Sequence, residues 1–510
     1  MIPNRQTTKT GNRSWLHDGL ALLAGALLPL AFSPFDWSYL AILAILLLFN
    51  SWLYATPARA FVRGYFFGLG QFGVGVSWVY VSMHTYGGAD AFEATALTAF
   101  FILFLALYPA VAGYLGVRIG ASASRGVKLL LLFPSSWVLL EWFRGWFLTG
   151  FPWLQVGYSQ VATLLGGVAP IAGVHGVSLA VTWLAGLALC SLPARARHRR
   201  GSILAVLAMV AFLVVCAGLG RVEWTHAAGK PFKATLVQGN IPQNVKWQPE
   251  FQRSTLDLYT ELTRQHWSSR LIIWPETAVP AFHHQVKDTY LADLQEEAAR
   301  SDTDLLIGIP VVELPSERYY NAIVALGSQP GTYFKRHLVP FGEFLPLRPI
   351  LGFVLDLLQI PLADFSRGSE QQQALVAAGY PLAASICYED IFGQEALASL
   401  PTAAYLVNVT NDAWFGDSIA PHQHLQMARM RALETGRYML RATNTGVTAA
   451  ISPRGAIVSQ APMFQRSVVT AEIEPMQGAT PYIRYGDWPV IIVLFGTWLA
   501  AFPYRRRVVS

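Results

Sequence analysis

Eight long apolar runs constrain the fold of this chain more than any other feature of its sequence. A helix that crosses a membrane needs about 20 mostly apolar residues. Seven such runs precede residue 221 and one follows residue 487. They lie at 16–33, 38–55, 64–83, 94–117, 129–147, 164–190, 202–220 and 488–503. Charged residues make up only 13% of the chain, against roughly 25% in soluble domains, which excludes a wholly soluble protein. We therefore predict an α-helical membrane bundle of eight transmembrane helices.

The distribution of charge predicts how this bundle is oriented. Residues 1–220 contain 13 basic and 5 acidic residues, whereas residues 221–487 contain 21 basic and 26 acidic residues. Basic clusters precede the first run or follow runs two, four, six and eight, where the last cluster is Arg505 to Arg507. Because basic residues accumulate on the cytoplasmic side, we expect both termini in the cytoplasm and residues 221–487 outside it. No basic run is interleaved with exposed aromatic residues, so the net charge of +6 does not indicate nucleic-acid binding.

Three regions follow from these patterns: a membrane domain at 1–220, an outer domain at 221–487, and an eighth helix with a basic tail at 488–510. The outer domain alternates strand and helix patterns, which indicates an α/β fold. Predicted strands are Ala234–Gln238, Leu271–Trp274, Leu305–Ile309, Ala322–Ala325, Ala383–Ile386 and Tyr405–Val409, with further strands within 437–474. Predicted helices are 249–266, 286–301 and 421–435.

Three chemically interesting residues, Glu276, Lys335 and Cys387, each follow an apolar stretch of the outer domain. Cys387 has no partner there, and an unpaired cysteine is a liability in an oxidising compartment. A carboxylate that accepts the thiol proton, an ammonium that stabilises an oxyanion, and a thiolate together form a nucleophilic set. Taken singly, each residue also has a plain interpretation: a strand terminator, a solvated lysine and a packed thiol. Cys190 and Cys216 lie in apolar runs, where burial is the simplest interpretation.

Glu, Lys and Cys in this order resemble the carbon–nitrogen hydrolase (nitrilase) superfamily. Joined to seven apolar runs before and one after, the chain resembles the apolipoprotein N-acyltransferase family. The motifs that carry the resemblance cover nearly the whole chain. They are Ser77–Tyr80, Gly150–Trp153, Gly157–Gln160, Gln238–Gln243 with Lys246-Trp247, Trp274–Glu276, His337–Glu343, Cys387–Asp390, Asn408–Phe415 and Pro421–Glu434.

The resemblance implies an αββα sandwich for the outer domain and assigns roles within it. Cys387 would be the nucleophile, Glu276 the general base and then acid, and Lys335 the group that stabilises the oxyanion. Glu343 and Glu389 would be accessory carboxylates that position the lysine or the region of the nucleophile.

The resemblance also implies the reaction. An acyl chain would pass from a phospholipid, phosphatidylethanolamine by family resemblance, to a thioester on Cys387. It would then pass to the N-terminal amine of a diacylglyceryl-cysteine apolipoprotein. Trp247 and Tyr388 would shape the pocket or its loops, with no cofactor and no metal. The enzyme would be a monomer in the bacterial inner membrane, with its catalytic domain on the periplasmic side. Two alternatives stay open: a membrane-tethered amidase acting on a soluble substrate, and a catalytically inactive lipid-binding module.

Three further features allow more than one interpretation. Glu141 and Arg144, near the end of the fifth run, either pair as plain structure or line a path for lipid. His422 and His424 lack a third ligand at a sensible spacing, which favours structural roles over a metal site. Pro340–Asp364 is either a lid that dips into the bilayer or a packed loop.

Overall fold

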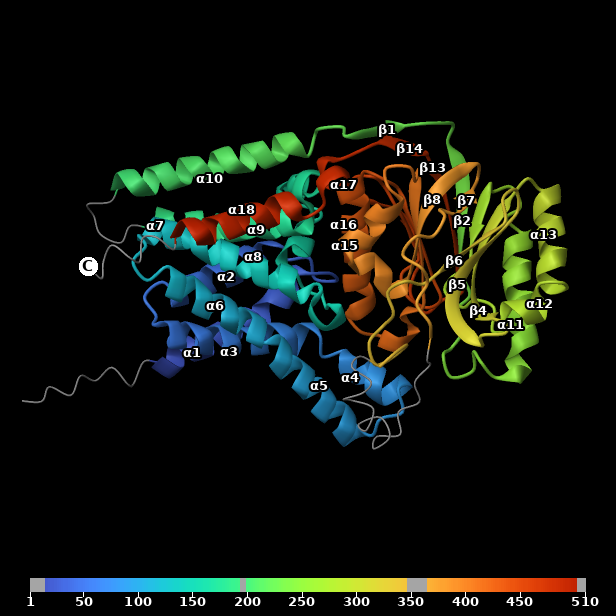
Figure 1. The fold of residues 1–510 in the computed structure, drawn as a ribbon, viewed down its shortest axis with the longest axis horizontal. Coiled ribbons are helices and arrows are strands. Elements are labelled where there is room, and N and C mark those ends of the chain that lie inside the picture. Colours follow the sequence, from blue (N-terminus) through green and yellow to red (C-terminus); the bar gives the residue numbers. More distant parts are fainter. Residues whose placement is uncertain (1–13, 193–198, 346–364, 502–510) are drawn as a thin grey trace, which may run out of the picture.

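The computed structural model describes residues 14–192, 199–345 and 365–501, and these form a helical bundle beside a two-sheet domain (Figure 1). Helices of the first 220 residues make up most of the bundle, and the C-terminal helix α18 Trp488–Ala501 returns to pack against α8 Phe133–Arg144. Most of the segment 340–364, expected to be a lid or a packed loop, lies outside the described residues. The membrane part and the α/β part thus occupy opposite ends of the molecule (Figure 1).

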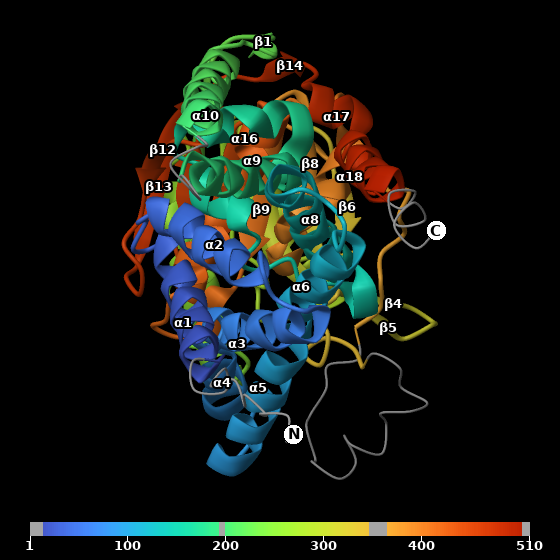
Figure 2. The same ribbon diagram turned by 90° about the vertical axis from the view of Figure 1, so that its left-hand side faces the viewer.

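The bundle is built from helices of very different lengths. They are α1 Ser14–Leu27, α2 Tyr39–Trp52, α3 Pro57–Gly75, α4 Val79–Val81, α5 Ala91–Leu105, α6 Leu107–Ile119, α7 Arg125–Val127, α8 Phe133–Arg144, α9 Ala169–Ser191, α10 Arg199–Leu219, α17 Pro481–Tyr485 and α18 Trp488–Ala501. Seen from the bundle end, α10 and α18 lie at the periphery of the bundle (Figure 2). One face of α10 carries exposed apolar side chains such as Leu204 and Val214, as a surface against lipid requires.

Four described helical segments are long and apolar enough to cross a membrane: Ala91–Ile119, Arg125–Arg144, Leu164–Ser191 and Arg200–Leu219. The pair Pro57–Gly75 and Val79–Tyr86, bent by 54°, makes a fifth if it is one span. Three shorter apolar helices, Trp15–Ala31, Tyr39–Trp52 and Trp488–Ala500, fall at the remaining predicted runs. The bundle is confirmed as a set of apolar helices, and the number eight stays a prediction.

Close helix packing in the bundle depends on glycine. A Cβ at Gly70 of α3 would overlap the Leu22 carbonyl of α1, and a Cβ at Gly25 of α1 would overlap the Phe67 carbonyl of α3. Small residues let helix backbones approach closely in membranes, where lipid provides no hydrophobic drive for association. These glycines therefore set the separation of the first and third helices.

Two six-stranded sheets form the outer domain. Their strands are β2 Phe232–Gln238, β3 Leu271–Ile273, β4 Asp304–Glu313, β5 Arg318–Leu326, β6 Gly331–Phe334, β7 Val376–Ala377, β8 Tyr380–Ile386, β9 Tyr405–Thr410, β10 Met439–Thr443, β11 Ala449–Ile451, β12 Ile457–Gln460 and β13 Ser467–Ile473. The spatial orders are β13-β2-β3-β4-β5-β6 and β12-β11-β10-β9-β8-β7. Each sheet has a parallel centre, β2-β3-β4 or β8-β9-β10, flanked by antiparallel strands. A small third sheet pairs β1 Thr225–Ala227 with β14 Met476–Gly478.

Four layers result from the packing of these sheets with helices. The two sheets face each other across one apolar core that includes Leu236, Ile273 and Val407. Helices α11 Pro249–Arg264 and α13 Tyr290–Arg300, with the short α12 His283–Val286, cover the outer face of the first sheet (Figure 1). Helix α16 Ala420–Thr435 covers the second sheet and separates it from the bundle, next to the short α15 Gly393–Ala396.

Each strand and helix predicted from the sequence of the outer domain is present, with small shifts at the ends. For example, β3 ends at Ile273 and β4 continues to Glu313. The strand β6, which has only four residues, was not among the predicted strands. It is this strand that leads directly into Lys335.

Candidate active site

The carboxyl ends of β3, β6 and β8 bring Glu276, Lys335 and Cys387 together between the two sheets. Lys335 Nζ lies 3.7 Å from Glu276 Oε1. The charges of Glu276 and Lys335 both act on the pKa of the Cys387 thiol. Ligands and reactive groups of α/β proteins gather at the carboxyl ends of strands. The proximity expected from sequence is therefore observed, while the roles of the three residues stay predictions.

Glu276 is held in place by donors from three other segments. Its Oε1 accepts a hydrogen bond from Asn321 Nδ2 at 2.6 Å, and its Oε2 accepts one from the Asn411 N–H at 2.8 Å. Lys246 Nζ donates to the Glu276 carbonyl oxygen at 3.2 Å. A Cβ at Gly308 would collide with the backbone of Pro275 and Glu276, so β4 approaches this turn only because it carries glycine there. The carboxylate is thus buried and fixed in orientation.

Lys335 sits between two carboxylates rather than facing one. Its Nζ donates to Glu343 Oε1 at 2.8 Å, a shorter contact than the one to Glu276. Burial by itself lowers the pKa of Lys335, but Glu343 and Glu276 together hold the pKa above its ordinary value. Glu343 is itself fixed, because its Oε2 accepts a hydrogen bond from the Val339 N–H at 2.8 Å. The ammonium therefore stays charged at physiological pH.

Cys387 occupies a strained turn directly after β8. Its φ of +52° lies in the left-handed region, which costs a residue with a side chain roughly 1–2 kcal/mol. The surrounding protein desolvates the thiol although the residue keeps some exposure, and this burial raises its pKa well above the ordinary value. Glu276 raises the pKa further, while Lys335 and a hydrogen bond with Thr410 oppose the shift. Lys335 and Thr410 therefore do not keep the thiol of Cys387 ionised before substrate binds. A base must remove the thiol proton during attack.

Glu389 ties the turn after β6 to the turn that carries Cys387. Its Oε1 accepts from the backbone N–H groups of Arg336 and His337, at 2.5 and 3.0 Å. Its Oε2 accepts from the Ile386 N–H at 2.7 Å and from the Tyr333 hydroxyl at 3.0 Å. Burial, and then Glu395, raise the pKa of Glu389 to about 7, while the backbone donors oppose that rise. This geometry suits the positioning role expected for Glu389.

The two aromatic residues of the predicted pocket differ in their surroundings. Tyr388 is buried, and its hydroxyl donates to the Gly150 carbonyl of the bundle at 3.0 Å. Trp247 is 50% exposed and follows Lys246, the lysine bonded to the Glu276 carbonyl. Tyr388, the residue after Cys387, therefore connects the turn of the nucleophile to the helical bundle. The Trp247 side chain is half exposed.

Sequence reasoning missed Asn321 and the backbone N–H of Asn411 as partners of Glu276. Asn321 is a buried amide within the otherwise apolar end of β5, and that isolated polar residue was the available indication. Asn411 lies in a motif noted for its resemblance, but the sequence does not reveal that its backbone makes the contact. The partner of Glu141 was also unexpected.

Glu141 and Arg144 do not form an ion pair with each other in the part of the chain that the structure describes. Glu141 Oε1 accepts from the Val156 N–H and from Trp137 Nε1, both at 2.9 Å. Arg144 Nη1 donates to the carbonyl oxygens of Phe151 and Trp153, at 2.8 and 2.5 Å. Together they anchor the segment at 151–156, which follows Gly150, the partner of Tyr388. They also line a small cavity with residues such as Gln71 and Tyr108, so a place on a lipid path stays open.

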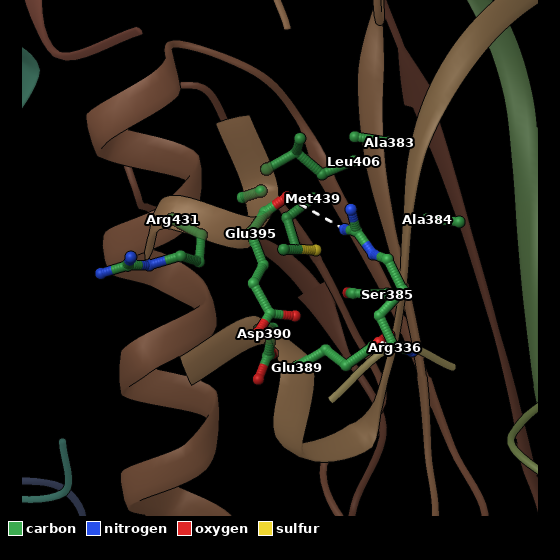
Figure 3. A pocket seen from close by; sticks show the side chains of 11 residues that line it. Arg336, Ala383, Ala384, Ser385, Glu389, Asp390, Glu395, Leu406, Arg431 and Met439 are labelled. Carbon is green, nitrogen blue, oxygen red and sulfur yellow. Dashed lines mark hydrogen bonds between the residues drawn. The ribbon is translucent and has the colours of Figure 1, made fainter. Parts of the chain in front are cut away.

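A second cavity lies behind the reactive residues, between β8 and α16. Figure 3 shows acidic Glu389, Asp390 and Glu395 beside Arg336 and Arg431 at its wall. Its lining does not include Glu276, Lys335 or Cys387. The cavity is therefore separate from the place where an acyl group would be attacked.

Among the described residues, no group of three or more His, Cys, Asp or Glu side chains is arranged to hold a metal ion. The two histidines considered from sequence differ in role. His424 is buried between Asp390 and Asp412, whereas His422 is half-buried on the same helix. His424 is thus part of a charge cluster of the protein itself.

Comparison with known proteins accounts for both halves of the chain. Residues 24–187 match the family described as "Apolipoprotein N-acyltransferase N-terminal domain", and residues 233–482 match the family described as "Carbon-nitrogen hydrolase". The apolipoprotein N-acyltransferase of Methylococcus capsulatus is 58% identical, over 96% of this chain and 97% of that protein. The apolipoprotein N-acyltransferase of Nitrosomonas europaea is 44% identical, over 96% of this chain and 97% of that protein. The chain therefore belongs to the apolipoprotein N-acyltransferase family, and its apolar helical bundle is joined to a carbon–nitrogen hydrolase domain.

Proposed function

We propose that this enzyme N-acylates lipoproteins in two steps through a thioester on Cys387. In the first step Glu276 takes the thiol proton as the sulfur attacks the ester carbonyl of a phospholipid. The developing oxyanion is stabilised by Lys335. The ester C–O bond then breaks, Glu276 returns the proton to the leaving oxygen, and a lysophospholipid departs. The acyl chain is left on sulfur.

In the second step the N-terminal amine of the diacylglyceryl-cysteine acceptor attacks the thioester carbonyl. Glu276 removes a proton from the attacking nitrogen, the C–S bond breaks, and the Cys387 sulfur regains a proton. The products are an amide on a triacylated lipoprotein and the free enzyme. No oxidant, reductant or cofactor is needed for the atoms to balance.

The observation that carries this proposal is the fixed set of Glu276, Lys335 and Cys387. Lys335 is 1% exposed and Glu276 is 6% exposed, whereas Cys387 keeps partial exposure. The base and the ammonium are therefore shielded from water, and Cys387 is the most exposed residue of the three. Such shielding favours transfer to an amine over hydrolysis, and it strengthens the charge of Lys335 on the oxyanion.

The substrates and the orientation are part of the proposal. We infer a phosphatidylethanolamine donor, diacylated apolipoprotein acceptors and a monomeric enzyme in the bacterial inner membrane. The five long or bent spans and the three shorter apolar helices would supply eight crossings. Both termini would be cytoplasmic, and the catalytic domain at 221–487 would lie in the periplasm between the membrane domain at 1–220 and the last helix with its tail at 488–510. Basic clusters after every second apolar run support this orientation.

Mass spectrometry of the purified enzyme mixed with phosphatidylethanolamine tests the mechanism. We expect an acyl adduct on the peptide that contains Cys387, together with an equal amount of lysophospholipid. Cys387→Ala should remove both, and Cys216→Ala, which changes a buried thiol of α10, is the matched control and should retain both. Full acceptor amidation by Cys387→Ala would disprove the thioester route. If water rather than a lipopeptide amine took the acyl group at the full rate, the amidase alternative would be correct.

A further inference from the structure

Four buried charged side chains form a closed cluster directly behind the reactive residues. They are Asp390, Asp412, His424 and Arg441, and each is at most 2% exposed. Asp390 belongs to the short turn Cys387–Ile391 that carries the nucleophile, and Asp412 begins the turn Asp412–Phe415 after β9. His424 comes from α16 and Arg441 from β10. The cluster therefore joins four separate elements.

His424 bridges the two carboxylates with both of its ring nitrogens. Its Nε2 lies 2.8 Å from Asp390 Oδ1, and its Nδ1 lies 2.9 Å from Asp412 Oδ1. Ionised carboxylates only accept hydrogen bonds, so the ring donates to both of them when it is an imidazolium. Arg441 makes a second bridge, donating to Asp390 Oδ2 at 2.9 Å and to Asp412 Oδ2 at 3.0 Å.

The protonated state of His424 also balances charge. Asp390, Asp412 and Arg441 alone would leave one uncompensated negative charge in the interior, which is costly. Burial and Arg441, whose Nη2 lies 2.9 Å from His424 Nδ1, lower the pKa of His424, but Asp390 and Asp412 hold that pKa above its ordinary value. With His424 protonated, two cations face two anions.

The Asp412 side of the cluster is connected to both Cys387 and Glu276 through neighbouring residues. Thr410 Oγ1 donates to Asp412 Oδ1 at 3.3 Å, and the same threonine is among the groups that lower the pKa of the Cys387 thiol. The residue before Asp412 is Asn411, whose N–H holds Glu276 Oε2 at 2.8 Å.

Arg441 reaches the nucleophile by a second path. Its Nη1 donates to Asn408 Oδ1 at 2.6 Å, and Asn408 Nδ2 donates to the Cys387 carbonyl oxygen at 3.3 Å. The cluster thus holds in place both the turn that carries Cys387 and the segment whose Asn411 N–H bonds Glu276.

We propose that His424 is a positioning residue for the acylation of Cys387: by bridging Asp390 and Asp412 it fixes the turn of the nucleophile relative to the strand end that holds Glu276. This inference rests on the proposed thioester route. His424 touches neither the reacting atoms nor the substrate, so its effect passes through the two aspartates. A misplacement of about 1 Å between reacting groups can cost roughly 100-fold in rate.

Aromatic residues, one of them from the bundle, cover the His424 side of the cluster. The ring of Trp153 lies 5.7 Å from the His424 ring, centre to centre, and Trp153 Nε1 donates to Gln423 Oε1 at 2.6 Å. Phe415, in the turn that starts with Asp412, lies 6.4 Å from the same ring. An aromatic wall thus excludes water from the bridge, and Arg144 anchors that wall through the Trp153 carbonyl.

Single-turnover acylation of the full-length enzyme tests the inference. The probe is phosphatidylethanolamine with a labelled acyl chain in detergent micelles, and the readout is label on Cys387 against time. The amplitude counts competent molecules, and the rate constant reports how well each one is positioned. His424→Gln retains polarity but loses the charge and offers donors at one end only, so we expect its rate constant to fall at least 10-fold per competent molecule. A purely structural role would lower the amplitude and leave the rate constant unchanged.

Two further variants make the result decisive. His422→Gln, on the same helix but outside the cluster, should acylate at the wild-type rate. If His424→Gln does not fold, Asp390→Asn/His424→Gln restores neutrality, because Asp412 and Arg441 then remain as one ion pair. We expect that double variant to show the same slow rate constant. A rate constant within twofold of wild type in either His424 variant would overturn the inference. Absence of label on wild-type Cys387 would instead overturn the proposed thioester route.

Discussion

Replacing Glu276 by glutamine should separate the acidity of the Cys387 thiol from its usefulness as a nucleophile. The negative charge of Glu276 is one of the causes that raise the pKa of Cys387, second only to burial. Removing that charge lowers the pKa of the thiol. At the same time the variant loses the group that accepts the thiol proton. We therefore expect Glu276→Gln to hold a more acidic thiol and yet to transfer acyl chains far more slowly.

General-base catalysis sets the scale of the expected loss of rate. Even at the ordinary thiol pKa of 9.0, about 1 thiol in 100 is ionised at pH 7, and burial raises the pKa of Cys387 above that value. General bases typically supply 10²–10⁴-fold, so the loss of Glu276 should cost at least ~100-fold, or about 2.7 kcal/mol. Glutamine also presents an amide to one of two donors, Asn321 Nδ2 and the Asn411 N–H, so one hydrogen bond is lost.

Two assays on the same preparation check this prediction. The pH dependence of iodoacetamide alkylation at Cys387 reports the pKa of the thiol, and formation of the labelled acyl-enzyme reports the chemical step. We expect the alkylation profile to move to lower pH and the acylation rate to fall at least 100-fold. Glu261→Gln, the same exchange at an exposed position of α11, controls for effects of altered net charge. An alkylation profile that moved to higher pH, or acylation at the wild-type rate, would refute the reasoning.

Three further variants probe the ammonium, the charge cluster and the bundle. Lys335→Met leaves Glu276 and Glu343 without their shared cation, so we expect acylation to fall by roughly 100-fold or more and stability to fall by about 3–5 kcal/mol; an unchanged Tm would contradict the buried ion pairs. Although burial opposes it, Arg441 and His424 hold the pKa of Asp412 at about 2, below its unfolded value. The stabilisation is therefore present above about pH 4 and is lost as pH falls toward 2. Asp412→Asn should flatten the dependence of Tm on pH between 2 and 4, and a wild-type slope in that variant would count against the cluster. Gly70→Ala should lower Tm because its Cβ overlaps α1, whereas Gly73→Ala on the same helix meets no atom within 4 Å and should be neutral or slightly stabilising; equal Tm changes would exclude glycine-limited packing.

The sequence was sufficient to predict the apolar helices and the strand ends because both depend on local patterns. The length of an apolar run can be counted in the sequence. A polar residue directly after a strand pattern indicates the end of the strand at which its side chain lies. Glu276, Lys335 and Cys387 could therefore be proposed as one set before any geometry was known. The short strand β6 escaped because four residues carry too little alternation to stand out.

Contacts made by backbone groups and by distant side chains could not be predicted in this way. The N–H of Asn411 supports Glu276 from 135 positions away, and any residue could supply such a donor. Four donors converge on Glu389, from β6, the turn after it and the end of β8, although only its identity as a carboxylate was visible in the sequence. Likewise, Glu141 and Arg144 lie one turn apart but bond to the chain at 151–156 instead of to each other.

By itself the sequence determined which segments are apolar enough for a membrane, which residues end the strands, and that a lone thiol accompanies a carboxylate and a lysine. Only the tertiary structure decided the balance of effects on that thiol. Lys335 opposes the rise in the pKa of Cys387, but burial and Glu276 outweigh it. Desolvation and Coulomb interactions depend on distances between residues far apart in the chain and on the atoms that exclude water from them. The direction of the pKa shift, and with it the need for a base during attack, therefore follows from packing and not from residue order.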